Sequence, residues 1–209
     1  MKKYTSEQRG RSMIEMLGVL AIVGVLSVAG IAGYSKAMAK YKTNKLIDQV
    51  STVAANIRTT FAAQGNYKGL TSDTAYSLGI YPEEVAKECD LTNNTDSTES
   101  CLKNAFGGQL VVFTDASDDD VQGNNFFDVA VDHLSKDACT ALVMADWGPA
   151  SSVVGLMKTT SNSGEAYEVV GEDRELYSLS ELRNSSTTIA AEVCDCGSEN
   201  KCVVNWRFN

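Results

Sequence analysis

The side chains that could carry out catalysis are few in this chain of 209 residues. His133 is the single histidine, flanked by Asp132 and Leu134. A Ser/His/Asp or Cys/His site needs a nucleophile, a base and an orienting group that converge, and the sequence offers no second base to support one. We therefore expect His133 to be a surface or edge residue, and we expect that the protein is not an enzyme.

An acidic stretch is the candidate for metal binding. Asp115, Asp118 and Asp120 lie close together in the sequence, and calcium is bound by oxygen ligands such as carboxylates. The stretch lacks the EF-hand pattern, and acidic loops are usually only solvated. We expect no metal or other cofactor; if calcium were bound, these three aspartates would be its candidate ligands.

The cysteines indicate disulfide bonds. They are even in number and include no Cys-x-x-Cys spacing, and with a single histidine the ligand set of a zinc site is missing. Since all of them follow an apolar, export-like segment, we expect them to be oxidised outside the cytoplasm. They are Cys89, Cys101, Cys139, Cys194, Cys196 and Cys202.

The most unusual carboxylate is Glu15, because it lies in the apolar segment Met13–Ile31 (MIEMLGVLAIVGVLSVAGI). As a helix this segment would be about 28 Å long, close to the hydrocarbon thickness of a bilayer. The basic residues that precede it predict a cytoplasmic N-terminus and an exported C-terminal part; they are Lys2, Lys3, Arg9 and Arg11. An acidic residue in a membrane helix costs about 2.5–3.5 kcal/mol at the centre, so Glu15 needs a function and a partner.

Three interpretations of this segment compete. It could be a conventional secretory signal that is cut near Ala32, a simple membrane anchor, or a segment that survives because a short leader is cut before it. The first two gain nothing from Glu15. The third interpretation is favoured because it gives the carboxylate a purpose.

The residues around the start of the segment resemble a known processing motif. Gly10-Arg11-Ser12-Met13-Ile14-Glu15 is similar to the cleavage motif of type IV prepilins, with Arg11 at a position that is usually apolar. The resemblance implies cleavage after Gly10 by a prepilin peptidase, methylation of the new amine of Arg11, and pairing of Glu15 with the amine of a neighbouring subunit. The residues expected in the filament core are Met13, Ile14, Leu17, Leu20, Ile22 and Val25.

The helical pattern continues beyond the apolar segment. An apolar stripe at spacings of three and four predicts an amphipathic helix; it consists of Leu46, Val50, Val53, Ile57 and Phe61. The opposite face carries Asp48, Gln49, Thr52, Asn56 and Arg58. Because Gln64-Gly65-Asn66 is a helix stop, we predict one helix from about Ser12 to about Ala63.

The rest of the chain predicts an α+β head, with an antiparallel sheet on the second half of the long helix. Expected strands or short buried segments are Val111–Phe113, Phe126–Val131, Ala141–Ala145 and Val203–Phe208, and Ser135–Met144 could equally be a helix. A helical turn is expected at Val85–Glu88 and a polar loop at Thr92–Ser100.

Several stretches of the head resemble the type IVb pilins, which include a PilS-like subgroup; they are Asn66–Leu70, Ile80–Pro82 and Asn104–Gly108. This resemblance implies a disulfide between a head helix and a C-terminal strand, for which Cys139–Cys194 is favoured. Cys196–Cys202 would then close a hairpin, and Cys89–Cys101 would fix the polar loop. The sequence leaves open which of the last three cysteines pairs with Cys139.

The charge excludes one class of partner. The formal net charge is -9, and the chain without its basic leader is still more acidic. Binding of nucleic acid through a basic patch is therefore not expected.

We thus expect a type IV pilus subunit that is held in the bacterial inner membrane as a precursor and then assembled by pilus machinery into an extracellular homo-oligomeric filament for adhesion, bundling or conjugation. Its parts would be a leader (1–10), a filament-core half of the helix (11–33), an amphipathic half (34–65) and a disulfide-containing head (66–209). The alternatives are a minor pilin, a type II secretion pseudopilin, or a secreted disulfide-rich binding protein.

Overall fold

A computed structural model describes residues 13–87, 89, 98–114, 125–147, 153–157, 176–196 and 201–209. The leader, Gly10 and Arg11 lie outside the described residues, and so do Asp115, Asp118 and Asp120. Contacts within the chain divide it into two compact units, Met1–Lys40 and Tyr41–Asn209. Each unit is described by itself below.

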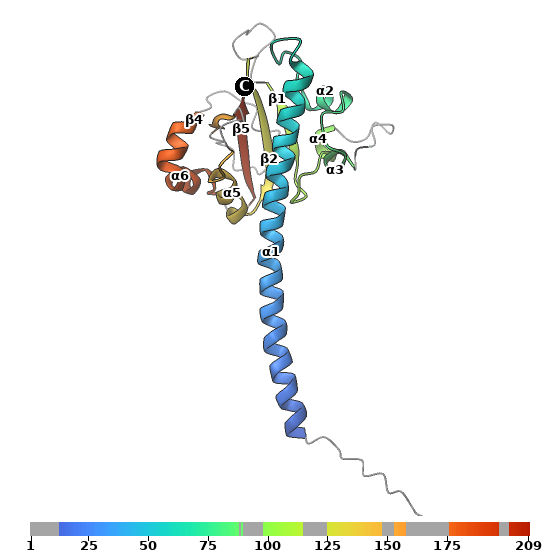
Figure 1. The fold of residues 1–209 in the computed structure, drawn as a ribbon, viewed down its shortest axis with the longest axis vertical. Coiled ribbons are helices and arrows are strands. Elements are labelled where there is room, and N and C mark those ends of the chain that lie inside the picture. Colours follow the sequence, from blue (N-terminus) through green and yellow to red (C-terminus); the bar gives the residue numbers. More distant parts are fainter. Residues whose placement is uncertain are drawn as a thin grey trace, which may run out of the picture. The chain divides into compact units, whose positions relative to one another are not determined.

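The predicted long helix is present as α1 (Met13–Phe61), a single helix of 49 residues (Figure 1). It ends where the backbone N–H groups of Gln64 and Gly65 both donate to the carbonyl of Phe61. Gly65 has a φ of 72°, which is the left-handed conformation that glycine adopts readily after a helix. The predicted stop signal therefore ends α1 within two residues of the expected position.

The head contains a five-stranded antiparallel sheet with the order β1-β2-β5-β3-β4. Its strands are β1 (Leu110–Phe113), β2 (Phe127–Leu134), β3 (Val153–Met157), β4 (Leu176–Ser178) and β5 (Cys202–Phe208). The C-terminal strand β5 is central, between β2 and β3. The expected α+β fold, with an antiparallel sheet against the second half of the long helix, is confirmed.

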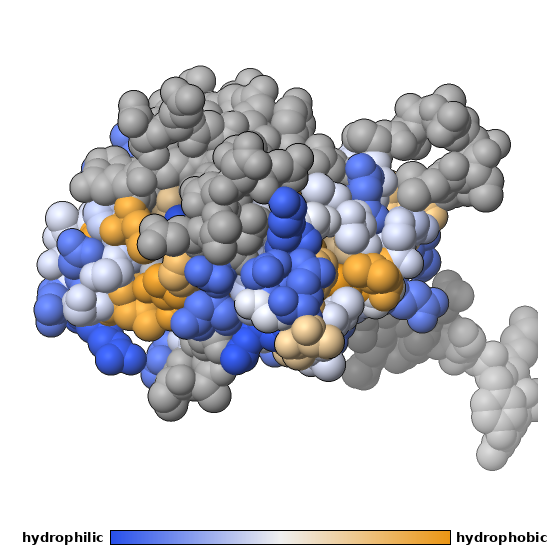
Figure 2. All heavy atoms as spheres, turned by 90° about the horizontal axis from the view of Figure 1, so that it is seen from above, coloured by the Kyte–Doolittle hydropathy of each residue, from blue (hydrophilic) through white to orange (hydrophobic). Residues whose placement is uncertain are grey.

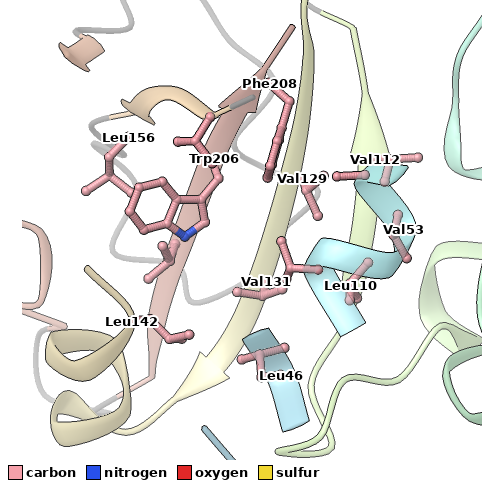
Figure 3. Close-up of a cluster of buried hydrophobic side chains, with 14 of the residues drawn as sticks. Leu46, Val53, Leu110, Val112, Val129, Val131, Leu142, Leu156, Trp206 and Phe208 are labelled. Atoms are coloured by element: carbon pink, nitrogen blue, oxygen red, sulfur yellow. The ribbon is translucent and has the colours of Figure 1, made fainter. Parts of the chain in front are cut away.

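One face of the sheet packs against the apolar stripe of α1. The stripe residues Leu46, Val50, Val53, Ile57 and Phe61 are all buried, as their spacing predicts. They share one core cluster with alternate strand residues, which point to the same face because side chains alternate along a strand. Figure 3 shows these strand residues, which include Val112, Val129, Val131, Trp206 and Phe208.

Five short helices surround this core. Figure 1 shows α2, α3 and α4 on one side of the C-terminal half of α1, and α5 and α6 on the other. Their bounds are α2 (Ser72–Ser77), α3 (Glu83–Ala86), α4 (Thr98–Cys101), α5 (Lys136–Val143) and α6 (Leu179–Val193). Serine N-caps begin the two longest of them, at Ser135 and Ser178.

Two sequence predictions for the head were wrong in part. Ala141–Ala145 is not a strand, because Ser135 caps a helix whose buried residues Ala138 and Leu142 recur at a spacing of four. The expected polar loop at Thr92–Ser100 ends in α4, which begins at Thr98. The elements α2, β3, β4 and α6 were not predicted from the sequence.

Candidate assembly helix and head surfaces

The first half of α1 exposes an apolar surface. Every residue from Met13 to Ala37 is exposed, and the expected filament-core residues retain between 64% and 85% of their surface; they are Met13, Ile14, Leu17, Leu20, Ile22 and Val25. An apolar surface of this size in water is unfavourable and marks a site for contact with protein or membrane. By length and composition α1 could cross a bilayer, because an 18-residue window within it has a mean hydropathy of 2.3. A signal sequence near the N-terminus would meet the same criterion.

Glu15 interrupts this surface in the first turn of α1. Among the described residues it has no ion-pair or hydrogen-bond partner. A carboxylate in the first turn is favoured by the partial positive charge of the helix N-terminus. The carboxylate is thus available to a partner outside the described part of the chain.

The serines and glycines in the apolar first half of α1 allow this half to pack closely against another helix. The hydroxyls of Ser27 and Ser35 donate within the helix to the carbonyls of Val23 and Ile31, at 2.8 and 3.0 Å, so neither hydroxyl needs water. The glycines have open space where a Cβ would lie, and such positions allow another helix to approach closely; they are Gly18, Gly24, Gly30 and Gly33.

The second half of α1 holds the following head segment through polar side chains. Gln49 was predicted on the solvent face, but it is buried and its oxygen accepts from the backbone N–H of Ala105 at 3.0 Å. The amide of Gln49 also donates to Glu84 at 2.9 Å, and the amide of Asn56 donates to the carbonyl of Ile80 at 2.8 Å. Gln49 and Asn56 border the apolar stripe of α1, so the head segment that packs on the stripe also covers these two residues.

Lys45 and Glu84 form the ion pair of this contact, with an N–O distance of 2.8 Å. The hydrogen bond from Lys45 is the main cause that lowers the pKa of the Glu84 carboxyl below its usual value, and the bond from Gln49 lowers it further. The same hydrogen bond raises the pKa of Lys45. Both side chains are partly exposed, so solvent screens the pair.

The loop between α4 and β1 is organised by Asn104. Its side-chain oxygen accepts from the N–H groups of Phe106 and Gly108, and its amide donates to the carbonyls of Gln109 and Asp132. A Cβ at Gly108 would lie 2.3 Å from the Asp132 carboxylate, so only glycine fits there. The stretch Asn104–Gly108, singled out by its resemblance to pilin sequences, thus forms a fixed loop against the sheet and α1.

His133 is exposed and lies at the bulge of β2, where the pairing with β5 shifts between Val131 and Leu134. Its φ is 57°, and its Nδ1 is 2.8 Å from the buried carboxylate of Asp132. Among the described residues, His133 has no hydrogen bond to a serine, threonine or cysteine side chain. The described residues also contain no cluster of three or more residues suited to hold a metal ion.

Three disulfides join the head: Cys89–Cys101, Cys139–Cys194 and Cys196–Cys202. The first connects Cys89, three residues beyond the end of α3, to the last residue of α4. The second connects α5 to the residue that ends α6, and it is buried at both ends. The third connects the chain after α6 to the first residue of β5. The second and third disulfides together tie α5 and α6 to the central strand β5.

The sequence did not predict that Gln49 is buried or that the side chain of Asn104 organises its loop, although both residues lie in elements that were singled out. One signal was available for α6: Ser178 and Glu181 have the Ser-x-x-Glu spacing of a capping box, and both reciprocal hydrogen bonds are present. The other residues act through long-range contacts that carry no local sequence pattern.

The long helix α1 is apolar in its first half and amphipathic in its second half, which packs against an antiparallel sheet. Disulfides link the helices at the side of this sheet. This arrangement is the architecture of a pilin. The model of the family described as Bundlin matches residues 35–208. No curated protein matches the chain. Two solved structures are similar in part. TcpA, a type IV pilin from Vibrio cholerae El Tor, has 15% sequence identity and a TM-score of 0.46, and the match covers 81% of this chain and 99% of TcpA. A type IVb pilin from Salmonella typhi has 18% sequence identity and a TM-score of 0.42, and the match covers 78% of this chain and 95% of that pilin.

The chain belongs to the Bundlin family. It is therefore a structural subunit of a pilus, an extracellular filament built from copies of the subunit, and the family is structural rather than enzymatic.

Proposed function

We propose that the chain is made as a precursor with the leader 1–10, is cut after Gly10 by a prepilin peptidase, and is methylated on the new amine of Arg11. The segment 11–33 holds the precursor in the bacterial inner membrane and later forms the filament core. The segment 34–65 and the head 66–209 remain outside the core. Pilus assembly machinery extracts the subunit from the membrane.

The observation that carries this proposal is the exposed apolar half of α1 with a single carboxylate near its start. Both environments in the proposed pathway cover such a surface: first lipid, and then the same helices of neighbouring subunits. Glu15 pairs there with the amine of Arg11 of a neighbour, since a buried carboxylate is tolerated when it is paired.

The surface of the head has the character of an exposed filament surface. The chain is acidic, and Figure 2 shows hydrophilic side chains over much of the described head, with apolar side chains gathered in separate patches. Loops on this surface mediate the adhesion, bundling or conjugation contacts of the pilus. An acidic surface keeps such contacts selective, because like charges oppose non-specific association.

The intact mass and the N-terminal sequence of protein recovered from the filament fraction test this proposal. We expect a chain that starts at Arg11, with a mass that fits three disulfides and one methyl group. A chain that starts near Gly33 has lost the apolar helix and would overturn the proposal in favour of a secreted binding protein. Uncleaved protein confined to the membrane fraction would overturn the proposed processing.

A further inference from the structure

Four lysines follow the apolar segment of α1 and form a basic section in an acidic chain. They are Lys36, Lys40, Lys42 and Lys45. No acidic residue lies between Glu15 and Asp48 of α1, whereas the whole chain has a formal net charge of -9. The exported flank of a membrane helix usually has few lysines. The three disulfides indicate that this flank is exported, so its lysines need a function.

Two of the four lysines have a partner in the head unit. The Nζ atom of Lys45 is 2.8 Å from the carboxylate of Glu84, and that of Lys42 is 5.8 Å from the centroid of the Phe106 ring. Lys36 and Lys40 are exposed, and among the described residues their side chains have no ion pair or hydrogen bond. Their charges are therefore available to a partner outside the described part of the chain.

The two unpaired lysines are neighbours on one face of α1, because they are four residues apart. Tyr34 precedes them and is 68% exposed. Tyrosine is enriched at membrane–water interfaces, since its ring is apolar and its hydroxyl polar. The long apolar stem of a lysine likewise lets its ammonium group reach the polar headgroups. Tyr34, Lys36 and Lys40 therefore have the character of an interfacial contact.

The position of these residues along the helix agrees with that character. The headgroup region adds about 5–8 Å on each side of the hydrocarbon core. Lys36 lies five residues beyond Ile31, the end of the apolar segment, which is a rise of about 7.5 Å. With the apolar segment in the bilayer, Lys36 is at the level of the headgroups and Lys40 is one turn further out.

We propose that Tyr34, Lys36 and Lys40 bind the headgroups of anionic phospholipids in the outward-facing leaflet of the inner membrane. Each ammonium group pairs with a lipid phosphate, and the tyrosine ring packs at the boundary of the acyl chains. Because an anionic surface repels the acidic head, this contact offsets the repulsion and fixes the depth of the helix. The inference rests on the proposed membrane-held precursor and names the lipid class that it selects.

Lipid selectivity measured in membranes tests the proposal. The full-length precursor is reconstituted in phosphatidylcholine vesicles with a trace of spin-labelled phosphatidylglycerol or spin-labelled phosphatidylcholine. Electron paramagnetic resonance then gives the fraction of immobilised label, and from it the relative association constant. We expect the wild-type protein to prefer phosphatidylglycerol, and we expect this preference to disappear in 1 M salt, where the Debye length is about 3 Å.

Variants that all keep the basic leader locate the contact, because the leader also attracts anionic lipid. Lys36→Gln and Lys40→Gln should each lower the preference by about two- to fivefold, since a lysine near an anionic surface contributes a factor of this order. Lys36→Arg/Lys40→Arg keeps both charges and should keep the preference. Lys68→Gln removes an exposed charge of the head unit and should leave the preference unchanged.

The outcomes separate this inference from the proposed function. If Lys36→Gln/Lys40→Gln inserts and keeps the wild-type preference, the inference is overturned and the membrane-held precursor is not. An unchanged preference with a lower yield of sheared filaments would assign both lysines to carboxylates of a neighbouring copy, which also contradicts the inference. A wild-type protein that enters vesicles of neither composition would contradict the membrane-held precursor itself. Formation of all three disulfides is the folding control for every variant.

Discussion

Asp128 of β2 and Arg207 of β5 lie directly opposite each other in the sheet and form a bidentate ion pair, with two N–O distances of 2.8 Å. The side chain of Asp128 is completely buried and that of Arg207 is 15% exposed. Since side chains alternate along β2, and Phe127 and Val129 face the core with α1, the pair lies on the other face of the sheet. The pair also fixes the register of β2 against β5, because a slip of one residue would separate the two charges and leave each without its partner.

Breaking this pair should be strongly destabilising. Arg207→Leu leaves the buried carboxylate of Asp128 without its main counter-charge, which typically costs about 3–5 kcal/mol. Urea unfolding of the full chain, followed by tryptophan emission, measures the loss. The double variant Asp128→Leu/Arg207→Leu is the control, and it should regain most of the stability because no buried charge is left. A single variant as stable as the wild type would show that the pair does not hold the sheet.

The disulfides should differ in what they contribute. In the chain-entropy model a crosslink stabilises more when it closes a longer loop, so Cys139–Cys194, with a sequence separation of 55, should contribute about 4 kcal/mol. Cys196–Cys202, with a separation of 6, should contribute about 2 kcal/mol. The paired Cys→Ala variants are compared by urea unfolding. The reverse order would show that packing around the sulfurs outweighs loop closure.

The contact of Glu84 with Lys45 and Gln49 should make stability depend on acidity. The folded state lowers the pKa of Glu84, chiefly through the hydrogen bond from Lys45, so it binds that proton less readily than the unfolded chain. The contribution is present above the unfolded pKa, near the model-compound value of 4.5, and is lost as pH falls through the lower folded pKa. Glu84→Gln should therefore lower the urea midpoint at pH 7 and leave it nearly unchanged at pH 3.

The neighbouring residue supplies the control for this pH dependence. Glu83 shares the first turn of α3 and is exposed, so Glu83→Gln matches the change in charge and in helix-dipole interaction. It should show no comparable difference between pH 7 and pH 3. An equal effect of both substitutions would assign the dependence to net charge instead of to the ion pair.

The parts of the fold that could be predicted are those that are determined by residues close together in the sequence. The apolar stripe Leu46–Phe61 and the stop at Gln64–Asn66 are periodic or conformational signals, and they placed the bounds of α1 closely. The strands β1, β2 and β5 contain short runs of β-branched and aromatic residues, which can be recognised from the local sequence alone. The family model matches residues 35–208, so it agrees with the resemblance carried by the head stretches, and the N-terminal motif stays a prediction.

The parts that were missed depend on contacts between distant residues. β3 and β4 pair with each other and β3 pairs with β5. Gly155 interrupts the apolar run of β3, and β4 has only three residues, so neither was recognised as a strand from its sequence. Gln49 is polar and lies next to the apolar stripe of α1. It is buried because Ala105 and Glu84, which are distant in the sequence, pack against it and form hydrogen bonds with its side chain. The pocket lined by Val143, Leu182 and Trp206 brings together residues of α5, α6 and β5, and no sequence motif links them.

Glu15 gives the prediction that tests filament assembly most directly. In the proposed filament Glu15→Gln leaves the amine of a neighbouring subunit without its buried counter-charge, at a cost of about 3–5 kcal/mol. Incorporation per subunit should therefore fall on the order of a hundredfold or more, since each 1.4 kcal/mol is a factor of about ten. The amount of subunit in sheared filaments, relative to that in the membrane fraction, measures this change.

The matched control for Glu15→Gln is Asp48→Asn, which removes an exposed carboxylate from the second half of the same helix. It should leave filament yield unchanged, because Asp48 faces solvent in the head unit. Membrane insertion and disulfide formation should be normal in both variants, since the head lies outside the altered contact. Filaments at wild-type yield from Glu15→Gln would show that the carboxylate does not set the register of assembly, and that apolar packing of α1 is sufficient.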